Sequence, residues 1–323
     1  MTQVLFKRPK ILYGPLLSVL NETELSAVDM HFHTAHSMDA ISQIRTVLAK
    51  CRKDNIGVAI ADHNSISGVE QAFRLKKKEF VIPAIETQDH RGIHTIYYFY
   101  TLKDLQAFYH GEIERLRKAN PFFLDIPCED LMPRAKKYNG MVCVPHPYAP
   151  GVCGIHKIEI TKEITRNIDF IEGMNGCNMH HMNMKSVKWA KSLGKPMTAG
   201  SDGHTTGELG SALCLAHGSD VETFFDSIKK NKNLLVGKET NLFSNILHQI
   251  KKENLYFKRA EKKHEGMQWL KTHFDTEYNY LKYKVEKEKH KLLHHYHIHH
   301  GGAPLKEHHY LLTDKIKKIL GIR

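Results

Sequence analysis

The chain has 323 residues, 41% of them hydrophobic, and a formal net charge of +12. A chain of this length and apolar content can bury a large core, and its composition excludes a disordered, fibrous or disulfide-rich protein. The six cysteines are scattered without a C-x-x-C pair, which indicates reduced thiols in a cytoplasmic protein. No run approaches about 18 apolar residues, so we predict no transmembrane segment.

Charge divides the chain into two main parts. Residues 241–323 carry 17 Lys+Arg and 9 Asp+Glu, a net charge of +8, which leaves 30 minus 26, or +4, for residues 1–240. We predict a lead-in over 1–26, a catalytic domain over 27–240 and a basic, His-rich helical extension over 241–323. The extension fits either a solvated helical hairpin packed on the main domain or a docking surface for nucleic acid or an anionic membrane.

The first strand-like stretch, 27–33, carries two histidines. Its apolar and polar residues alternate with a period of two, which predicts a strand with His31 and His33 on the same face. Two imidazoles with this spacing point at one volume and can chelate zinc, iron, manganese or nickel. Asp39 adds an oxygen ligand just beyond the strand. An H-x-H pair alone also fits two half-exposed strand histidines, so its interpretation depends on the later strands.

Strand-like and helix-like stretches then alternate along the chain. Apolar runs are expected at 56–63, 80–86, 94–100, 140–147, 169–175, 196–204 and 211–216, and helices at 41–54, 67–78 and 185–193. Near-continuous apolar strands alternating with helices predict a parallel sheet that is buried on both faces. Seven such units favour a closed barrel over an open sheet.

Most of these runs end in histidine, aspartate or glutamate. The residues at or just after the strand ends are His31, His33, Asp62, His63, Glu86, His146, Asp202 and His204. In a barrel of strands and helices, the carboxyl ends of the strands meet on one face, so these side chains converge. Such a concentration of polar groups at an apolar barrel mouth is costly to desolvate unless bound divalent cations compensate. The pattern therefore predicts a metal site rather than satisfied core histidines.

The ordered motifs H-x-H, S-x-D, D-H-N, an apolar run ending in Glu, H-P and S-D-x-H resemble the polymerase and histidinol phosphatase (PHP) family of metal-dependent phosphoesterases. The resemblance covers about Val28 to Gly237 and implies an α/β fold, a distorted (β/α)7 TIM-like barrel, with two to three divalent metal ions (Mn, Zn or Fe). The implied ligands are His31, His33, Asp39, His63, Glu86, His94, His146, Asp202 and His204, with His90 as the alternative to His94.

The resemblance also implies how these ligands are grouped. One ion would be held by His31, His33, Glu86 and Asp202, a second by Glu86, His94 and His146, and a third by Asp39, His63 and His204. Glu86, Asp202 and His204 are the expected catalytic residues. Ser37-Met-Asp39 has one residue between Ser and Asp where many family members have S-D-G, which shifts the aspartate. Asp62 and Asn64 are candidates for orienting the ligands.

The expected activity is hydrolysis of a small phosphomonoester, from a metabolite or a nucleotide, by attack of a metal-bound hydroxide. Two alternatives stay open. The first is a nuclease or nucleoside 3′,5′-bisphosphatase that uses the basic extension to hold nucleic acid. The second is a non-catalytic metal-binding module. His180 and His181, which follow the 169–175 strand, could protonate a leaving group or cap a loop.

Overall fold

The computed structural model describes residues 10–13, 25–119, 123–149 and 153–239, so the predicted extension and most of the lead-in lie outside it. Within these residues, ten strands form one sheet in the order β1-β10-β9-β2-β3-β4-β5-β6-β7-β8. Their bounds are β1 Lys10–Tyr13, β2 Ser26–Phe32, β3 Gly57–Ile60, β4 Val81–Gln88, β5 His94–Tyr98, β6 Met141–Val144, β7 Phe170–Asn175, β8 Met197–Gly200, β9 Ala212–Ala216 and β10 Asn233–Gly237.

Strands β2 to β8 follow one another in chain order, and the two ends of this series meet. Phe32, at the end of β2, forms a bridge with Gly203, and the amide of His33 donates to the carbonyl of Gly203 at 2.9 Å. The amide of Asp202 donates back to the carbonyl of His31 at 2.8 Å. The sheet therefore curls into a nearly closed barrel, and the prediction of a closed α/β barrel is confirmed.

The prediction that the sheet is parallel is wrong for two strands. β5 runs antiparallel to β4 and β6, and β9 runs antiparallel to β10 and β2. No helix separates β4 from β5, because Asp89 accepts the amides of Arg91 and Ile93 at 2.8 and 3.0 Å and closes a tight turn with Gly92 at φ 84°. The predicted count of seven strand–helix units is therefore not confirmed.

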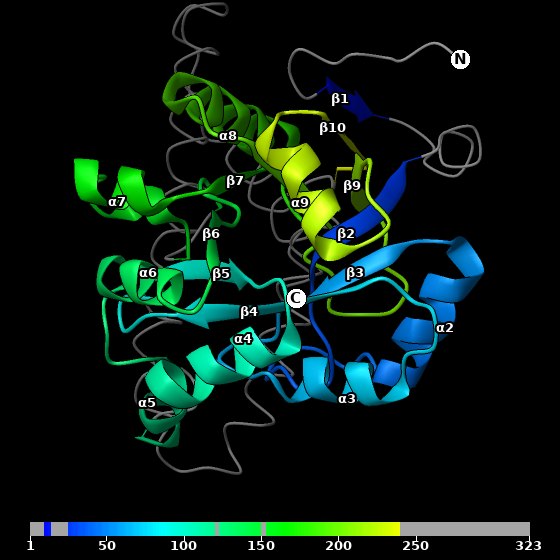
Figure 1. Ribbon diagram of the computed structural model, residues 1–323. Coiled ribbons are helices and arrows are strands. Elements are labelled where there is room, and N and C mark those ends of the chain that lie inside the picture. The colour runs from blue at the N-terminus through cyan, green and yellow to red at the C-terminus, as the bar shows by residue number, and fades with distance from the viewer. Residues whose placement is uncertain (1–9, 14–24, 120–122, 150–152, 240–323) are drawn as a thin grey trace, which may run out of the picture. The chain divides into compact units, whose positions relative to one another are not determined.

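Helices surround the strands (Figure 1). The α-helices are α2 Ile44–Asp54, α3 Ser67–Leu75, α4 Leu102–Phe108, α5 Glu114–Ala119, α6 Cys128–Lys136, α7 Lys162–Asn167, α8 His180–Leu193 and α9 Val221–Lys229. In α2, buried residues recur at the spacing of one helix face, which packs that face on the sheet. α8 starts five residues before the predicted 185, and it buries Met182 and Asn183 in that additional turn. No helix in the described part of the chain is long and apolar enough to cross a bilayer.

Aromatic side chains fill the barrel at the end away from the carboxyl ends of most strands. Phe225 of α9 stacks on Phe170, at the start of β7, with ring centroids 5.6 Å apart, and lies 5.6 Å from the ring of Tyr98. All three rings are buried. Since α9 covers this end with apolar groups, the polar residues gather at the opposite end.

Candidate metal centre

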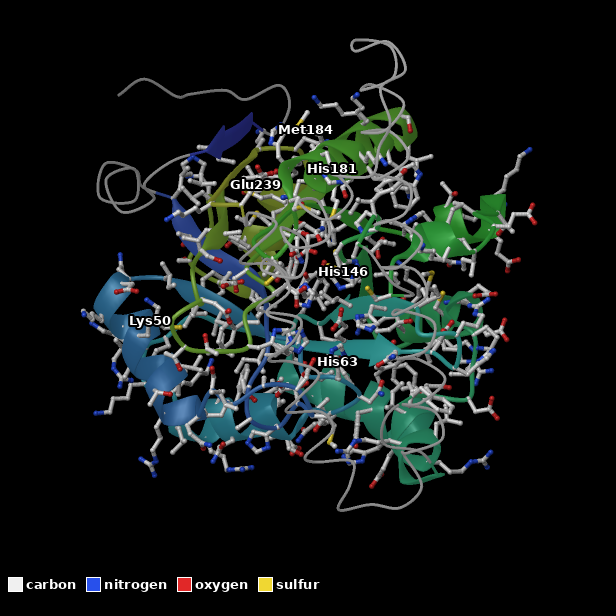
Figure 2. All side chains as sticks on the ribbon, turned by 180° about the vertical axis from the view of Figure 1, so that it is seen from behind. Lys50, His63, His146, His181, Met184 and Glu239 are labelled. Atoms are coloured by element: carbon white, nitrogen blue, oxygen red, sulfur yellow. The ribbon has the colours of Figure 1, made fainter. Side chains whose placement is uncertain are left out.

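The nine predicted ligands converge at one end of the barrel. Eight of them lie at or just beyond the carboxyl ends of β2, β3, β4, β6 and β8. His94 is instead the first residue of β5, and it reaches the same end because β5 runs antiparallel to its neighbours. Figure 2 shows His63 and His146 near the middle of the view, among the strands. The buried set is His31, His33, Asp39, His63, Glu86, His94, His146, Asp202 and His204.

Glu86 is at the centre of this cluster, and imidazoles surround its carboxylate. Five imidazole nitrogens lie within 3.5 Å of its two oxygens: His31 Nε2 at 3.5 Å, His33 Nε2 at 3.4 Å, His63 Nδ1 at 3.0 Å, His94 Nδ1 at 3.2 Å and His146 Nε2 at 3.3 Å. Neither oxygen makes a hydrogen bond of normal geometry, although both are buried. A carboxylate in this state is costly unless something other than hydrogen bonds satisfies it.

Divalent metal ions fit this arrangement. Metal–nitrogen and metal–oxygen bonds of about 2.0–2.2 Å, at angles between octahedral and tetrahedral, separate two ligand atoms of one ion by about 3.0–3.4 Å. Four of the five nitrogen–oxygen distances around Glu86 lie in this range and the fifth is 3.5 Å, whereas their directions do not suit hydrogen bonds. Imidazole nitrogen and carboxylate oxygen are the donors that zinc, manganese and iron take in proteins.

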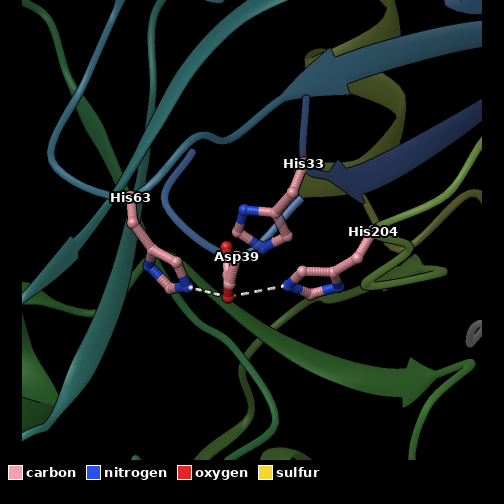
Figure 3. A group of neighbouring side chains, drawn as sticks. All are labelled: His33, Asp39, His63 and His204. Atoms are coloured by element: carbon pink, nitrogen blue, oxygen red, sulfur yellow. Dashed lines mark hydrogen bonds and ion pairs between the residues drawn. The ribbon is translucent and has the colours of Figure 1, made fainter. Parts of the chain in front are cut away.

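A second group lies around Asp39 (Figure 3). Asp39 Oδ2 is 3.0 Å from His204 Nε2 and 3.4 Å from His63 Nε2, and the four side chains His33, Asp39, His63 and His204 are close enough to share one ion. Ser37 Oγ donates to Asp39 Oδ1 at 2.7 Å and accepts the amide of His63 at 3.3 Å. The Ser-Met-Asp spacing therefore brings the shifted aspartate into the cluster.

A third group lies at the seam where β2 and β8 meet and close the barrel. His31 Nε2 and His33 Nε2 are 3.1 Å apart, and Asp202 Oδ1 is 3.6 and 3.4 Å from them. Asp202 and His146 both have positive φ, 53° and 27°, a backbone region that costs energy for residues other than glycine. The fold holds both residues in this conformation, which aims their side chains into the cluster.

The cluster sets the protonation of its members. Burial opposes the charge on Glu86, but the imidazoles of His94, His63 and His31 hold the pKa of this carboxyl well below its usual range. Burial lowers the pKa of His94 to about 4, so its imidazole is neutral at pH 7. An ionised carboxylate and a neutral imidazole are the forms that bind metals.

The structure also places the other residues that the sequence singled out near the ligands. His90 is exposed in the β4–β5 turn and lies outside the cluster that contains His94. Asp62 accepts the amide of Thr34 at 2.6 Å, and Asn64 Oδ1 accepts the amide of Gln88 at 3.0 Å, so both hold strand ends together. The predicted pair of histidines begins α8, where His180 contacts Glu239 at 2.8 Å.

The sequence reasoning missed one carboxylate that contacts a predicted ligand. Glu172, in the middle of β7, lies 3.1 Å from His31 Nδ1 and is buried. The signal was a charged residue in the interior of the run 169–175, three positions after Asp169. Its position in the middle of a strand, rather than at a strand end, distinguishes it from the predicted ligands.

Comparisons with known proteins agree with this architecture. A family model described as PHP-associated (PHP_C) matches residues 180–233. The chain is 26% identical over 229 residues to the uncharacterized protein MJ0417 of Methanocaldococcus jannaschii, which covers 68% of this chain and 84% of that protein. The fold of this chain is similar to that of a two-domain protein from Bacteroides vulgatus that contains a predicted PHP-like metal-dependent phosphoesterase. The TM-score is 0.51 and the identity 13%, over 77% of this chain and 74% of the other.

The fold is also similar to Endonuclease Q, whose structure was solved in complex with a 27-mer duplex substrate with an abasic lesion at the active site. The TM-score is 0.55 and the identity 17%, over 67% of this chain and 60% of that chain. These structures share the barrel, and the PHP-associated segment spans its last strands and helices. The chain therefore contains a PHP-associated segment, and its fold is similar to that of structures with a PHP-like domain.

Proposed function

We propose that the chain is a metal-dependent hydrolase that cleaves a phosphate ester, with a phosphomonoester of a small metabolite or nucleotide as its substrate. The observation that carries this proposal is the buried Glu86 carboxylate, which five imidazoles contact within 3.5 Å. No hydrogen-bond network explains this arrangement, and the shared coordination of divalent ions does.

The residues would hold two to three ions of manganese, zinc or iron. One ion would be held by His31, His33, Glu86 and Asp202, a second by Glu86, His94 and His146, and a third by Asp39, His63 and His204. The side chains close enough to share an ion overlap in the same way: His31, His33 and Asp202; His31, Glu86 and His146; His63, Glu86 and His94; and His33, Asp39, His63 and His204. When bound, such ions lower the pKa of water toward about 7 and polarise phosphoryl oxygens. Glu86, the carboxylate between the groups, is placed to belong to more than one of them.

With the ions bound, the net charge at the barrel mouth would favour an anionic substrate. Three divalent ions would bring a charge of +6 and the carboxylates Asp39, Glu86 and Asp202 a charge of −3, which leaves about +3 at the barrel mouth. A phosphomonoester dianion offsets most of this excess. Asp202 has the most exposed side chain of these three carboxylates, at 12%, so it lies nearest to an incoming substrate.

His204 is oriented by its own loop. Its Nδ1 lies 2.8 Å from the carbonyl of Asp202, which fixes the proton on Nδ1 and turns Nε2 toward Asp39 at 3.0 Å. We propose Glu86, Asp202 and His204 as catalytic residues. Glu86 would hold more than one of the ions, while Asp202 and His204 face these ions from the loop after β8.

Cleavage of nucleic acid is the second candidate. The net charge of +8 on residues 241–323 favours it, because a basic segment attracts phosphate backbones. The barrel shared with Endonuclease Q is in accord with it. A non-catalytic module is disfavoured, since a structural zinc site needs only about four closed ligands.

The test is phosphate release from the full chain loaded with manganese. The panel holds nucleoside monophosphates, a nucleoside 3′,5′-bisphosphate, histidinol phosphate and short oligonucleotides. We expect turnover of a monophosphate that Asp202→Asn abolishes and Asp226→Asn preserves, because Asp226 is an exposed carboxylate on α9 at the other end of the barrel. Oligonucleotide cleavage that weakens steeply with salt would favour the nuclease. Metal-loaded protein that releases phosphate from no member would contradict the proposal.

A further inference from the structure

Glu172 contacts groups of two predicted ligands from within the wall of the barrel. Its Oε1 lies 3.1 Å from His31 Nδ1, and its Oε2 accepts the backbone amide of His146 at 2.7 Å. The carboxylate is 2% exposed and comes from the middle of β7. It therefore touches the back of the cluster, away from the Glu86 carboxylate.

Asn175 extends this contact to a third ligand. Its Nδ2 donates to Glu172 Oε2 at 2.9 Å and also lies 3.3 Å from Asp202 Oδ2. The other oxygen of that aspartate, Oδ1, faces His31 and His33 at 3.6 and 3.4 Å. One amide group thus orients the Asp202 carboxylate so that a single oxygen is presented to the histidines.

The pair with His31 fixes a tautomer. A carboxylate is only an acceptor, so the proton of neutral His31 must be on Nδ1. Its Nε2 then carries the lone pair, and Nε2 is the atom that faces Glu86, Asp202 and His33. A carboxylate behind a metal-binding histidine raises the basicity of the ring and holds its orientation.

We propose that Glu172 is a positioning residue for the metal centre, with Asn175 as its partner. Glu172 holds His31 in the metal-binding tautomer, fixes the positive-φ backbone of His146 and, through Asn175, aims Asp202. The inference rests on the proposed metal site. It assigns these two residues a role through the ligands rather than direct contact with an ion or substrate.

The test compares Glu172→Gln with a matched change, Glu79→Gln. Glu79 is also a buried carboxylate, but it pairs with Arg52 and accepts the amide of Lys77 away from the cluster. Zn²⁺ and Mn²⁺ affinities are measured on the full chain at fixed pH by competition with a chromophoric chelator. We expect Glu172→Gln to weaken metal binding about 10–100-fold, and Glu79→Gln to leave it unchanged.

A second readout separates positioning from simple support of the fold. In the Zn²⁺-loaded protein, ¹⁵N resonances assigned with a His31→Gln variant should show His31 bound through Nε2 and protonated on Nδ1 in the wild type and in Glu79→Gln. In Glu172→Gln the ring should become a mixture of tautomers. A fold-supporting role alone would lower the melting temperature without changing this signature or the metal affinity.

Several outcomes would overturn the proposal. Wild-type affinity in a folded Glu172→Gln protein contradicts it directly. Where Glu172→Gln does not fold, Asn175→Ala takes its place, and unchanged metal affinity in that variant has the same meaning. A wild type that binds no divalent metal removes the site on which the inference rests. A wild type that binds metal but releases no phosphate contradicts only the proposed function.

Discussion

Gly200 in β8 packs tightly against His31 in β2, and adding one methyl group there tests how the barrel positions His31. A Cβ at Gly200 would lie 2.3 Å from His31 Cβ and 2.5 Å from His31 N. Since a backbone nitrogen cannot move by rotamer change, the strands β8 and β2 must separate. Reaching ordinary contact from 2.3 Å requires a displacement of about 1 Å.

Gly200→Ala should affect both stability and metal binding. Overpacking of this kind costs about 1–3 kcal/mol, and for a domain of this size each kcal/mol lowers the melting temperature by about 2–4 °C. The same displacement moves the main chain of His31, whose carbonyl accepts the amide of Asp202 at 2.8 Å. Two predicted ligands therefore shift together, and a misplacement of about 1 Å costs about 100-fold in rate.

The matched control for this experiment is Gly207→Ala, in the loop after β8. The nearest atom to a Cβ at Gly207 is Thr205 Oγ1 at 3.9 Å, so the methyl group makes only an ordinary van der Waals contact. Melting temperature by circular dichroism and metal affinity by chelator competition are measured for both variants. Equal values for Gly200→Ala and Gly207→Ala would refute the close-approach argument and, with it, the view that the β2–β8 contact sets the position of His31.

Three further predictions follow from the core and the site. Divalent metal at a hundredfold excess over its Kd should stabilise the fold by about 2.7 kcal/mol per site, measured as a chelator-reversible rise in melting temperature. Glu86→Gln should remove most of this rise. A full rise in that variant would contradict the central role of Glu86. Burial raises the pKa values of the Cys51 and Cys214 thiols to about 12, so at pH 8 only about one thiol in ten thousand is ionised. A thiol reagent followed by mass mapping should therefore label the half-buried Cys153 and Cys177 first. Early labelling of Cys51 would count against this account. Phe225→Ala should lower the free energy of unfolding, measured in urea, by about 3–5 kcal/mol but leave metal affinity unchanged, because Phe225 packs at the far end of the barrel. A matching loss of affinity would show that the two ends are coupled.

The sequence predicted the barrel and the convergence of the ligands because both depend on local patterns. Alternation of polar and apolar residues placed His31 and His33 on one face of a strand. Buried runs that ended in polar residues then indicated which chain segments meet at the barrel mouth. The ligand roles themselves stay predictions, which the metal-binding experiments address.

Strand direction was not predictable in the same way. β5 is buried along its whole length, as are its parallel counterparts, so its composition carries no sign of direction. The chain reverses at the turn 89–93, where the Asp89 side chain accepts two backbone amides and no helix intervenes between the strands. A histidine at the start rather than the end of a run was the visible trace of this reversal, because only an antiparallel strand brings its first residue to the mouth.

Glu172 was missed for a related physical reason. Ligands lie at strand ends, where the backbone is free to turn a side chain toward the site, but a group that orients a ligand must lie behind it. Behind His31 is the interior of the barrel wall, so the orienting carboxylate comes from the middle of β7, a strand that is buried along its whole length. A lone carboxylate within an apolar barrel strand has to find a donor, since an unpaired buried charge is too costly. In a barrel whose mouth is rich in histidines, a ligand imidazole is the donor within reach, so such a carboxylate points to the back of the metal centre.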